Sequence, residues 1–301
     1  MGSCSGYPRF DRRSRRVAPT DEMSPALQGM KNFTVTEKIF QVLRVGAAMC
    51  FIGHGAFGII TKPIWCNYFA VFGIGHDMAY RLMPIVGTAD VLMGISMLVY
   101  PTRAVTMWLV IWGIVTATLR PLSGEPFAEL IERAGNYGVP LSLILLCGGL
   151  AQVKLAPLKR IRAMTADPET SRWVFVCLSL TTFLLFAGHG WLNLIEKPAL
   201  LSQYQAFGFS QPEAVAHFFA GFEILSAMSI LVFPNRRLLL VLFVWKMSSE
   251  LFYPHYELFE WIERGGSYTA ILALWFCLEL KPLREQQGVS DDQLPGTPAR
   301  A

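Results

Sequence analysis

Two histidines lie inside long apolar runs that each end in Lys-Pro. The run FIGHGAFGIITKP contains His54, and the run FAGHGWLNLIEKP contains His189. An ionisable side chain inside a membrane segment is costly, and such residues almost always face a bundle interior or a water-filled cavity. An acid follows each histidine in the next apolar run, Asp90 after the first and Glu223 after the second. These four residues are therefore the first candidates for chemistry.

Depth along the helices brings each histidine level with its acid. His54 lies about seven residues, or ~10 Å, before the end of its span, because a helix rises 1.5 Å per residue. Asp90 lies about eight residues, or ~12 Å, after the start of the next span, on the same side of the membrane. The same count brings His189 level with Glu223. The sequence thus predicts two His–carboxylate pairs.

Such a pair can carry out chemistry or hold helices together. A carboxylate on one imidazole nitrogen fixes the tautomer and makes the other nitrogen a better base, which suits a proton relay, a metal ligand or a donor to a quinone carbonyl. Alternatively, the small glycines beside each histidine permit close helix approach, and the hydrogen bond joins two helices at a gain of about 1 kcal/mol. Both hypotheses remain open at this point.

Further polar residues are candidates for substrate binding. Lys62 and Lys197 close the two histidine runs beside prolines, where we expect snorkelling to the head groups, with binding of an anionic or quinone head group as the alternative. Lys246 and Glu250 are spaced i,i+4 and should form a paired couple inside the bundle. Arg120 has no basic counterpart in the second part of the chain, where Tyr253 is found.

The composition is that of a membrane protein. Of 301 residues, 53% are hydrophobic and 16% charged, against roughly 45–50% and 25% for a soluble domain. We therefore expect an all-α membrane protein with eight transmembrane helices, near 37–60, 82–100, 104–120, 137–153, 173–195, 215–233, 238–253 and 267–280. The net charge of +4 does not indicate nucleic acid, because the basic residues flank apolar spans. The six scattered cysteines form no C-x-x-C pair.

The chain contains an internal duplication. At an offset of 135, His54 matches His189 and Lys62 matches Lys197, and at an offset of 133 Asp90 matches Glu223. Farther on, ELIERAGNY matches EWIERGGSY. We predict a disordered basic cytoplasmic tail, a four-helix repeat, a basic cytoplasmic linker, a second four-helix repeat and a disordered tail, at 1–36, 37–153, 154–172, 173–281 and 282–301.

The repeats should be parallel, because four spans per copy return the chain to the side from which it started. Basic residues gather on the side of the tails and linker, which the positive-inside rule places in the cytoplasm together with both termini. The Glu-Arg-x-Gly-x-Tyr segments then face outward, as charged helix ends with Gly135 and Gly266 as C-caps, or as an outer rim. Trp112 and Trp245 fall mid-span, where core packing is expected.

The two copies differ in ways that favour one working site. Lys246 and Glu250 stand where the first copy has glycine and alanine, and only the second copy has His217 and His255. We therefore favour the second copy as the working one, since it is richer in ionisable residues.

The order of features in each copy resembles the DoxX-like family of four-helix membrane proteins. Each copy has a glycine-rich end to its first span, a lysine, Phe-Gly before the second span and an acid within it, then the turns YPTRA or FPNRR; Arg44 also fits the family. The resemblance implies two fused DoxX-like units, a bacterial inner membrane, and membrane redox chemistry of the kind seen in thiosulfate:quinone oxidoreductase. It also implies a membrane or extracytoplasmic redox partner.

Three functions follow from these observations. The first is a quinone-linked oxidoreductase component, in which His189 and Glu223 relay protons and Lys197 binds quinone or a small sulfur-linked reductant. The second is a subunit that holds a b-type haem or a metal between His54 and His189. The third is a non-catalytic carrier, channel or assembly factor, although we expect no clearly broken helix of the kind many transporters use.

Overall fold

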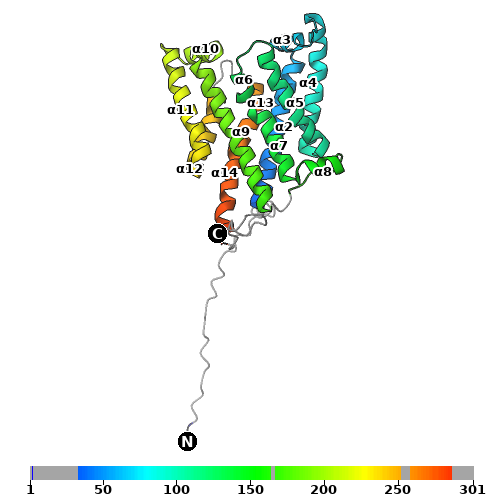
Figure 1. Ribbon diagram of the computed structural model, residues 1–301, viewed down its shortest axis with the longest axis vertical. Helices are drawn as coiled ribbons and strands as arrows, with labels where there is room; N and C mark the ends of the chain where they lie inside the picture. Colours follow the sequence, from blue (N-terminus) through cyan, green and yellow to red (C-terminus); the bar gives the residue numbers. More distant parts are fainter. Residues whose placement is uncertain (1, 3–32, 164–166, 252–257, 287–301) are drawn as a thin grey trace, which may run out of the picture. The chain divides into compact units, whose positions relative to one another are not determined.

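The computed structural model describes residues 2, 33–163, 167–251 and 258–286 (Figure 1), and within them all regular secondary structure is helical. Five of these helices are long and apolar enough to cross a membrane: α2 (Val35–Ile59), α4 (His76–Val99), α5 (Arg103–Leu122), α9 (Pro168–Leu194) and α11 (Pro212–Val232). A bent pair, α7 (Ala134–Leu146) and α8 (Gly149–Leu155), would make a sixth span. Helices α12 (Arg236–Leu251) and α14 (Gly265–Gln286) cover the last two predicted spans but do not meet the same criterion over their described residues.

The boundaries of the predicted tails and linker need adjustment. Helix α2 begins at Val35 and α14 runs to Gln286, so both helices enter segments expected to be disordered. Helix α8 extends to Leu155 and α9 begins at Pro168, which shortens the predicted linker from both sides. Most of both predicted tails, together with residues 164–166, lies outside the described residues.

The two helices that carry the histidines begin and end in matching ways. Helix α2 begins with a capping box, in which Thr34 Oγ1 accepts the backbone N–H of Glu37 and the Glu37 carboxylate accepts that of Thr34. Helix α9 begins with Asp167 capping its first turn. Past their C-termini, Thr61 and Glu196 adopt left-handed backbone angles, with φ of 55° and 54°. Each histidine helix is therefore terminated just before its Lys-Pro.

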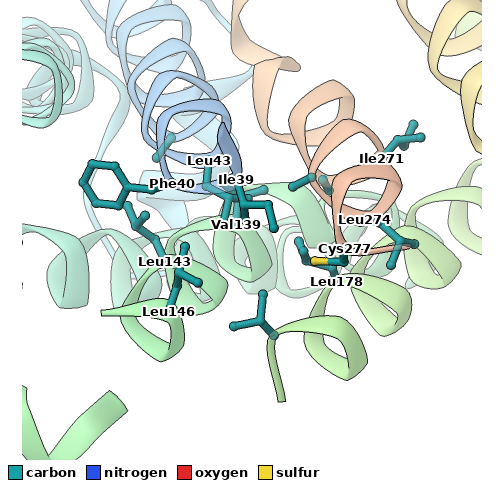
Figure 2. Close-up of a cluster of buried hydrophobic side chains, with 14 of the residues drawn as sticks. Ile39, Phe40, Leu43, Val139, Leu143, Leu146, Leu178, Ile271, Leu274 and Cys277 are labelled. Carbon is teal, nitrogen blue, oxygen red and sulfur yellow. The ribbon is translucent and has the colours of Figure 1, made fainter. Parts of the chain in front are cut away.

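Four helices form the centre of the bundle and four others pack around them. Helices α2 and α9 each contact both α7 and α14, and α7 also contacts α14. Helix α4 packs on α2, α5 on α7, α11 on α9 and α12 on α14 (Figure 1). The central helices share one hydrophobic core, shown in Figure 2, to which both parts of the chain contribute. Residues labelled there include Ile39, Leu43, Val139, Leu178 and Leu274. The described residues from Thr34 onward form one compact unit.

The outer helices expose rows of large apolar side chains. Such rows are what a lipid-facing helix surface requires, because there is no water to solvate polar groups at that depth. They include Ile85, Leu92 and Val99 on α4, Ile111 and Ile114 on α5, Phe218, Leu225 and Val232 on α11, and Leu240, Val241 and Val244 on α12. The fold is thus that of an all-helical membrane protein.

The fourth predicted span is broken, contrary to expectation. Helices α7 and α8 are bent by 80° at a break where Gly148 and Gly149 have φ of 102° and 73°. Positive φ is readily adopted only by glycine, so this glycine pair explains the bend. Leu150 and Leu155 on α8 are half or more exposed. The expectation of a single straight span over 137–153 was therefore wrong.

Short helices lie where the predicted outward-facing loops are. Helices α6 (Ala128–Glu132) and α13 (Leu258–Glu263) hold the Glu-Arg segments, and α3 (Trp65–Ala70) and α10 (Pro198–Ala206) follow the Lys-Pro pairs. Helix α6 packs against α9, and α13 packs against α2, so each of these two helices contacts the histidine helix of the other half.

Gly135 and Gly266 are not C-caps, contrary to the prediction. They lie in the first turns of α7 and α14, and a Cβ on Gly135 would be 2.8 Å from the carbonyl carbon of Gly266. A Cβ on Gly266 would be 2.7 Å from the carbonyl oxygen of Gly135. The two glycines therefore allow the backbones of the halves to meet.

Candidate functional site

Both predicted His–carboxylate pairs are present. His54 Nδ1 lies 2.7 Å from Asp90 Oδ2, and His189 Nδ1 lies 2.5 Å from Glu223 Oε2. Each acid side chain is only 1% exposed. An ionised carboxylate can only accept a hydrogen bond, so against it each Nδ1 would carry the proton and donate it. Nε2 is then the nitrogen that can accept a proton from another group.

The glycine before each histidine admits the short helix of the other half. A Cβ on Gly53 would lie 2.3 Å from the backbone nitrogen of Glu263, and a Cβ on Gly188 would lie 2.4 Å from that of Glu132. Contacts this short do not occur for real side chains, so only glycine fits. The contact between the halves therefore requires glycine at the position before each histidine.

The glycine after each histidine faces a different neighbour. Gly55 packs against Gly87 of α4, and Gly190 packs against Ile224 of α11, both within the same half. The close packing expected from the structural hypothesis is therefore present on both sides of each histidine. It places each imidazole where two helix contacts meet.

The two lysines bind acids across the duplication, where snorkelling to the head groups was expected. Lys62 forms an ion pair and hydrogen bond with Glu260, and Lys197 forms the same contacts with Glu129. The lysine side chains are 33% and 26% exposed, whereas Glu129 is 1% exposed. A buried carboxylate without a partner is costly, which explains why each lysine turns inward.

Two arginines repeat this exchange. Arg133 donates to Glu263 at 2.9 Å, and Arg264 donates to Glu132 at 2.5 Å. Together with the lysine pairs, these contacts involve four glutamates that each bind a cation of the other half. We call them the crossed acids: Glu129 and Glu132 on α6, and Glu260 and Glu263 on α13.

Three of the crossed acids, Glu129, Glu132 and Glu263, are ionised at neutral pH. Burial would raise the pKa of Glu132, but Arg264 and Arg133 outweigh it and hold the pKa well below its ordinary value. Burial would also raise the pKa of Glu263, but the nearby Arg133 outweighs it, so the pKa of Glu263 is lowered. The pKa of Glu129 is also lowered, by nearby cations that overcome its burial. Glu129, Glu132 and Glu263 are therefore carboxylates that accept hydrogen bonds.

Each histidine lines a cavity that crossed acids complete. The first-half cavity contains His54, Lys62 and Arg120 and is closed by Glu260 and Glu263 of α13. The second-half cavity contains catalytic candidates His189 and Glu223, together with Lys197 and Glu250, and is closed by Glu129 and Glu132 of α6. Neither cavity is built from one half alone. The volumes are about 110 Å³ for the first and about 410 Å³ for the second.

Aromatic residues of the first half explain the difference in volume. The ring of Trp65 lies 4.7 Å from that of His54, and Phe57 lies beneath the Lys62 ammonium at 4.1 Å. At the matching offset of 135 the second half has Leu200 and Leu192.

A third difference between the halves also narrows the first-half cavity. Tyr68 lies 5.5 Å from the Arg120 guanidinium and lines the first-half cavity, whereas Gln203 stands at the matching position. Arg120 itself is held by Glu125 at 2.9 Å and by Glu129 at 3.1 Å. These side chains narrow the first-half cavity, and the second-half cavity is the larger of the two.

The predicted Lys246–Glu250 couple is confirmed. Lys246 Nζ lies 2.7 Å from Glu250 Oε1, and both side chains are buried. Glu250 also pairs with Arg264 at 2.9 Å and lines the second-half cavity, whereas Lys246 does not line it. Lys246 therefore contacts a residue of the cavity wall without lining the cavity itself. Tyr253, the counterpart of Arg120, lies outside the described residues.

The other histidines of the second copy do not join the site. His217 is 52% exposed and lies 3.2 Å from Glu196, and His255 is outside the described residues. Within the described part of the chain, no group of three or more His, Cys, Asp or Glu side chains is arranged to hold a metal ion. His54 and His189 line different cavities, which gives no support to a shared haem iron.

The two mid-span tryptophans pack on the core as predicted and also line the cavities. Trp112 lines the first-half cavity and Trp245 the second. Trp245 stacks on Phe219 with ring centres 4.9 Å apart. Among the described residues neither indole N–H has a hydrogen-bond partner. Both nitrogens are buried, so the two tryptophans contribute their rings to the cavity walls.

Two residues beside His189 were missed by the sequence analysis. Asn193 is fully buried and contacts His189 and Glu223, and Tyr204 donates to Asn193 at 2.7 Å. Asn193 follows His189 by four residues in an apolar helix, and this i,i+4 spacing of polar residues was the available signal. Tyr204 lies in a separate helix, and no spacing rule connects it to the site.

Comparisons with known proteins do not place the chain in a family: no family model, no curated protein and no solved structure matches it.

Proposed function

We propose that this chain is an eight-span membrane protein made of two DoxX-like halves, with both termini in the cytoplasm of a bacterial inner membrane. The matched His–carboxylate pairs and the reciprocal pairs of the crossed acids support the duplication. The resemblance of each half to DoxX-like proteins supports the membrane and the topology. In this proposal the site of the second half works, and that of the first half is structural.

The proposed activity is that of a quinone-linked oxidoreductase component. One observation carries it: the cavity beside the His189–Glu223 pair is about 410 Å³, against about 110 Å³ beside His54. Small-molecule sites of about 300–1,000 Å³ with apolar walls and a few polar groups are typical of proteins. Apolar and aromatic walls of this kind are present: Leu192, Leu200, Phe207, Phe209, Phe219 and Trp245.

The charges around the second-half cavity favour a neutral ligand. Four carboxylates line it, from Glu129, Glu132, Glu223 and Glu250, against the two cations Lys197 and Arg264. A small anion, such as a sulfur-containing reductant, would be repelled by these carboxylates. A quinone ring is neutral and flat, and its carbonyl oxygens can accept a hydrogen bond from an ammonium such as that of Lys197.

Each group then has a defined role. Reduction of a quinone to a quinol takes two electrons, supplied by a membrane or extracytoplasmic redox partner, and two protons. His189 Nε2 would bind and release these protons while Glu223 stabilises the charged ring. Lys197 uses one N–H on Glu129 and has two further donors for a carbonyl oxygen at the cavity mouth.

The test is to purify the full chain in mild detergent and analyse its organic extract and visible spectrum. We expect quinone to co-purify with the wild type and with His54→Ala, and to be lost from His189→Ala. A quinone-free wild type would overturn the proposal and favour a carrier or assembly role. A Soret band lost in His54→Ala or His189→Ala would favour the haem alternative.

A further inference from the structure

Asn193 is hydrogen-bonded at both ends of its amide. Its Nδ2 donates to the carbonyl oxygen of His189 at 3.1 Å and to Glu223 Oε2 at 3.5 Å. Its Oδ1 accepts the hydroxyl of Tyr204 at 2.7 Å. Nδ2 also lies 3.3 Å from His189 Nδ1. A backbone carbonyl and an ionised carboxylate can only accept, and the Tyr204 hydroxyl donates to Oδ1, so these three partners set the orientation of the amide.

Tyr204 connects this amide to the cavity wall. It comes from α10, lines the second-half cavity and is 8% exposed. Its ring is held against Phe219, with ring centres 5.7 Å apart. A chain of contacts therefore runs from the wall through Asn193 to Glu223 and His189, and every member is held by packing or by a second hydrogen bond.

The first half contains neither residue. At the offset of 135, Gly58 replaces Asn193 and Phe69 replaces Tyr204. There is also no space for a larger residue, because a Cβ on Gly58 would lie 2.8 Å from the Cα of Gly87. His54 is instead held by its ring contact with Trp65. The two histidines are thus positioned by different means.

We infer that Asn193 and Tyr204 are positioning residues, which hold the Glu223 carboxylate on His189 Nδ1 and so keep Nε2 as the nitrogen that accepts protons. The inference rests on the proposed function of the second-half cavity. Glu223 Oε2 lies 2.5 Å from His189 Nδ1 and accepts a hydrogen bond from the Asn193 amide at 3.5 Å, so the amide limits rotation of the carboxylate. Without that limit the neutral imidazole is free to exchange its proton between the two nitrogens.

Other charged groups around His189 do not replace this control. Glu132 from α6 and Glu250 from α12 interact electrostatically with His189, but both are engaged by Arg264 at 2.5 Å and 2.9 Å. Within the described residues, Glu223 is the acid that is hydrogen-bonded to the ring.

The experiment is ¹⁵N NMR of histidine-labelled full-length protein in lipid nanodiscs, at a pH at which the imidazoles are neutral, with His189→Ala to assign the signal. In the wild type we expect the Nδ1–H tautomer at His189. Asn193→Gly, which carries the first-half residue, should give a mixture of both tautomers. Tyr204→Phe should shift the population in the same direction by a smaller amount. Phe69→Tyr, the matched control, should leave His54 unchanged.

Tyr204→Phe removes a single hydroxyl, so it keeps the inference testable if Asn193→Gly does not fold. An unchanged His189 tautomer in folded Tyr204→Phe and Asn193→Gly would overturn the inference. The measurement involves no quinone. A tautomer shift in a quinone-free protein would leave the positioning role standing while the proposed function fails, and bound quinone with an unchanged tautomer would do the reverse.

Discussion

The backbone nitrogen of Glu132 lies where a side chain on Gly188 would have to be: a Cβ built there is 2.4 Å away. Glu132 belongs to the first half and Gly188 to the second, and Gly53 meets Glu263 in the same way at 2.3 Å. Each contact brings a crossed acid beside the histidine that follows the glycine. The Gly-His-Gly sequence is therefore both a contact between the halves and part of a cavity wall.

Alanine at these glycines should destabilise the protein. Gly188→Ala and Gly53→Ala each force a backbone shift, and overpacking of this kind costs about 1–3 kcal/mol. Thermal unfolding in detergent measures the loss. Gly221→Ala is the control, because that glycine is exposed in α11 with nothing within 4 Å of its Cβ position. It should be neutral or stabilising by about 0.5–1 kcal/mol. Equal melting temperatures for all three variants would refute the close contact.

The crossed pair Arg133–Glu263 should show strong energetic coupling. Removing one member of a buried ion pair costs about 3–5 kcal/mol, because the other charge is left without a partner. We expect Arg133→Met and Glu263→Gln to destabilise by that order, and the double variant by less than the sum. Glu196→Gln, which disrupts an exposed contact with His217, should cost below about 1 kcal/mol. Additive effects in the double variant would show that the pair is not formed.

Low pH should destabilise the protein by protonating the crossed acids that connect the two halves. The pKa values of Glu129, Glu132 and Glu263 are lowered in the folded protein. Their stabilisation is therefore fully present above the unfolded carboxylate pKa and is lost as the pH falls toward the lowered folded values. We expect a flat melting temperature above about pH 5 and a decline below it.

The control for this pH dependence is Glu263→Gln, which removes one titrating group. It should be less stable at neutral pH but lose less stability than the wild type on acidification. A wild-type melting temperature that rises as the pH falls below about 5 would contradict the ionised state of Glu129, Glu132 and Glu263.

How much the sequence could predict depends on distance along the chain. Helix depth can be counted from one span to the next, which is why the pairing of His54 with Asp90 was predicted. The partner of Lys62, Glu260, lies in the other half, and no count of turns gives the rotation of one half against the other. The bend at Gly148 was missed because a glycine pair in an apolar run is also compatible with a straight span. The volume difference depends on Trp65 and its neighbours filling a space that only the assembled helices define.

Exchanging one side chain between the halves should move the open space. Leu200→Trp places in the second half the ring that fills the first, so we expect bound quinone to be lost with the fold retained. Trp65→Leu, the reciprocal variant, should leave quinone bound and enlarge the first-half cavity. The quinone content of each purified variant tests these two expectations about binding, with melting temperature as a check on folding. Quinone retained at wild-type level in Leu200→Trp would place its site elsewhere.

The most direct measurement is photolabelling of the full chain in nanodiscs with an azido-quinone, followed by mass spectrometry of its peptides. The proposed function predicts labels on residues that line the second-half cavity, among them Leu200, Phe219 and Trp245, and their loss when unlabelled quinone is added in excess. Labels on the first-half cavity, or labels that excess quinone does not remove, would contradict it.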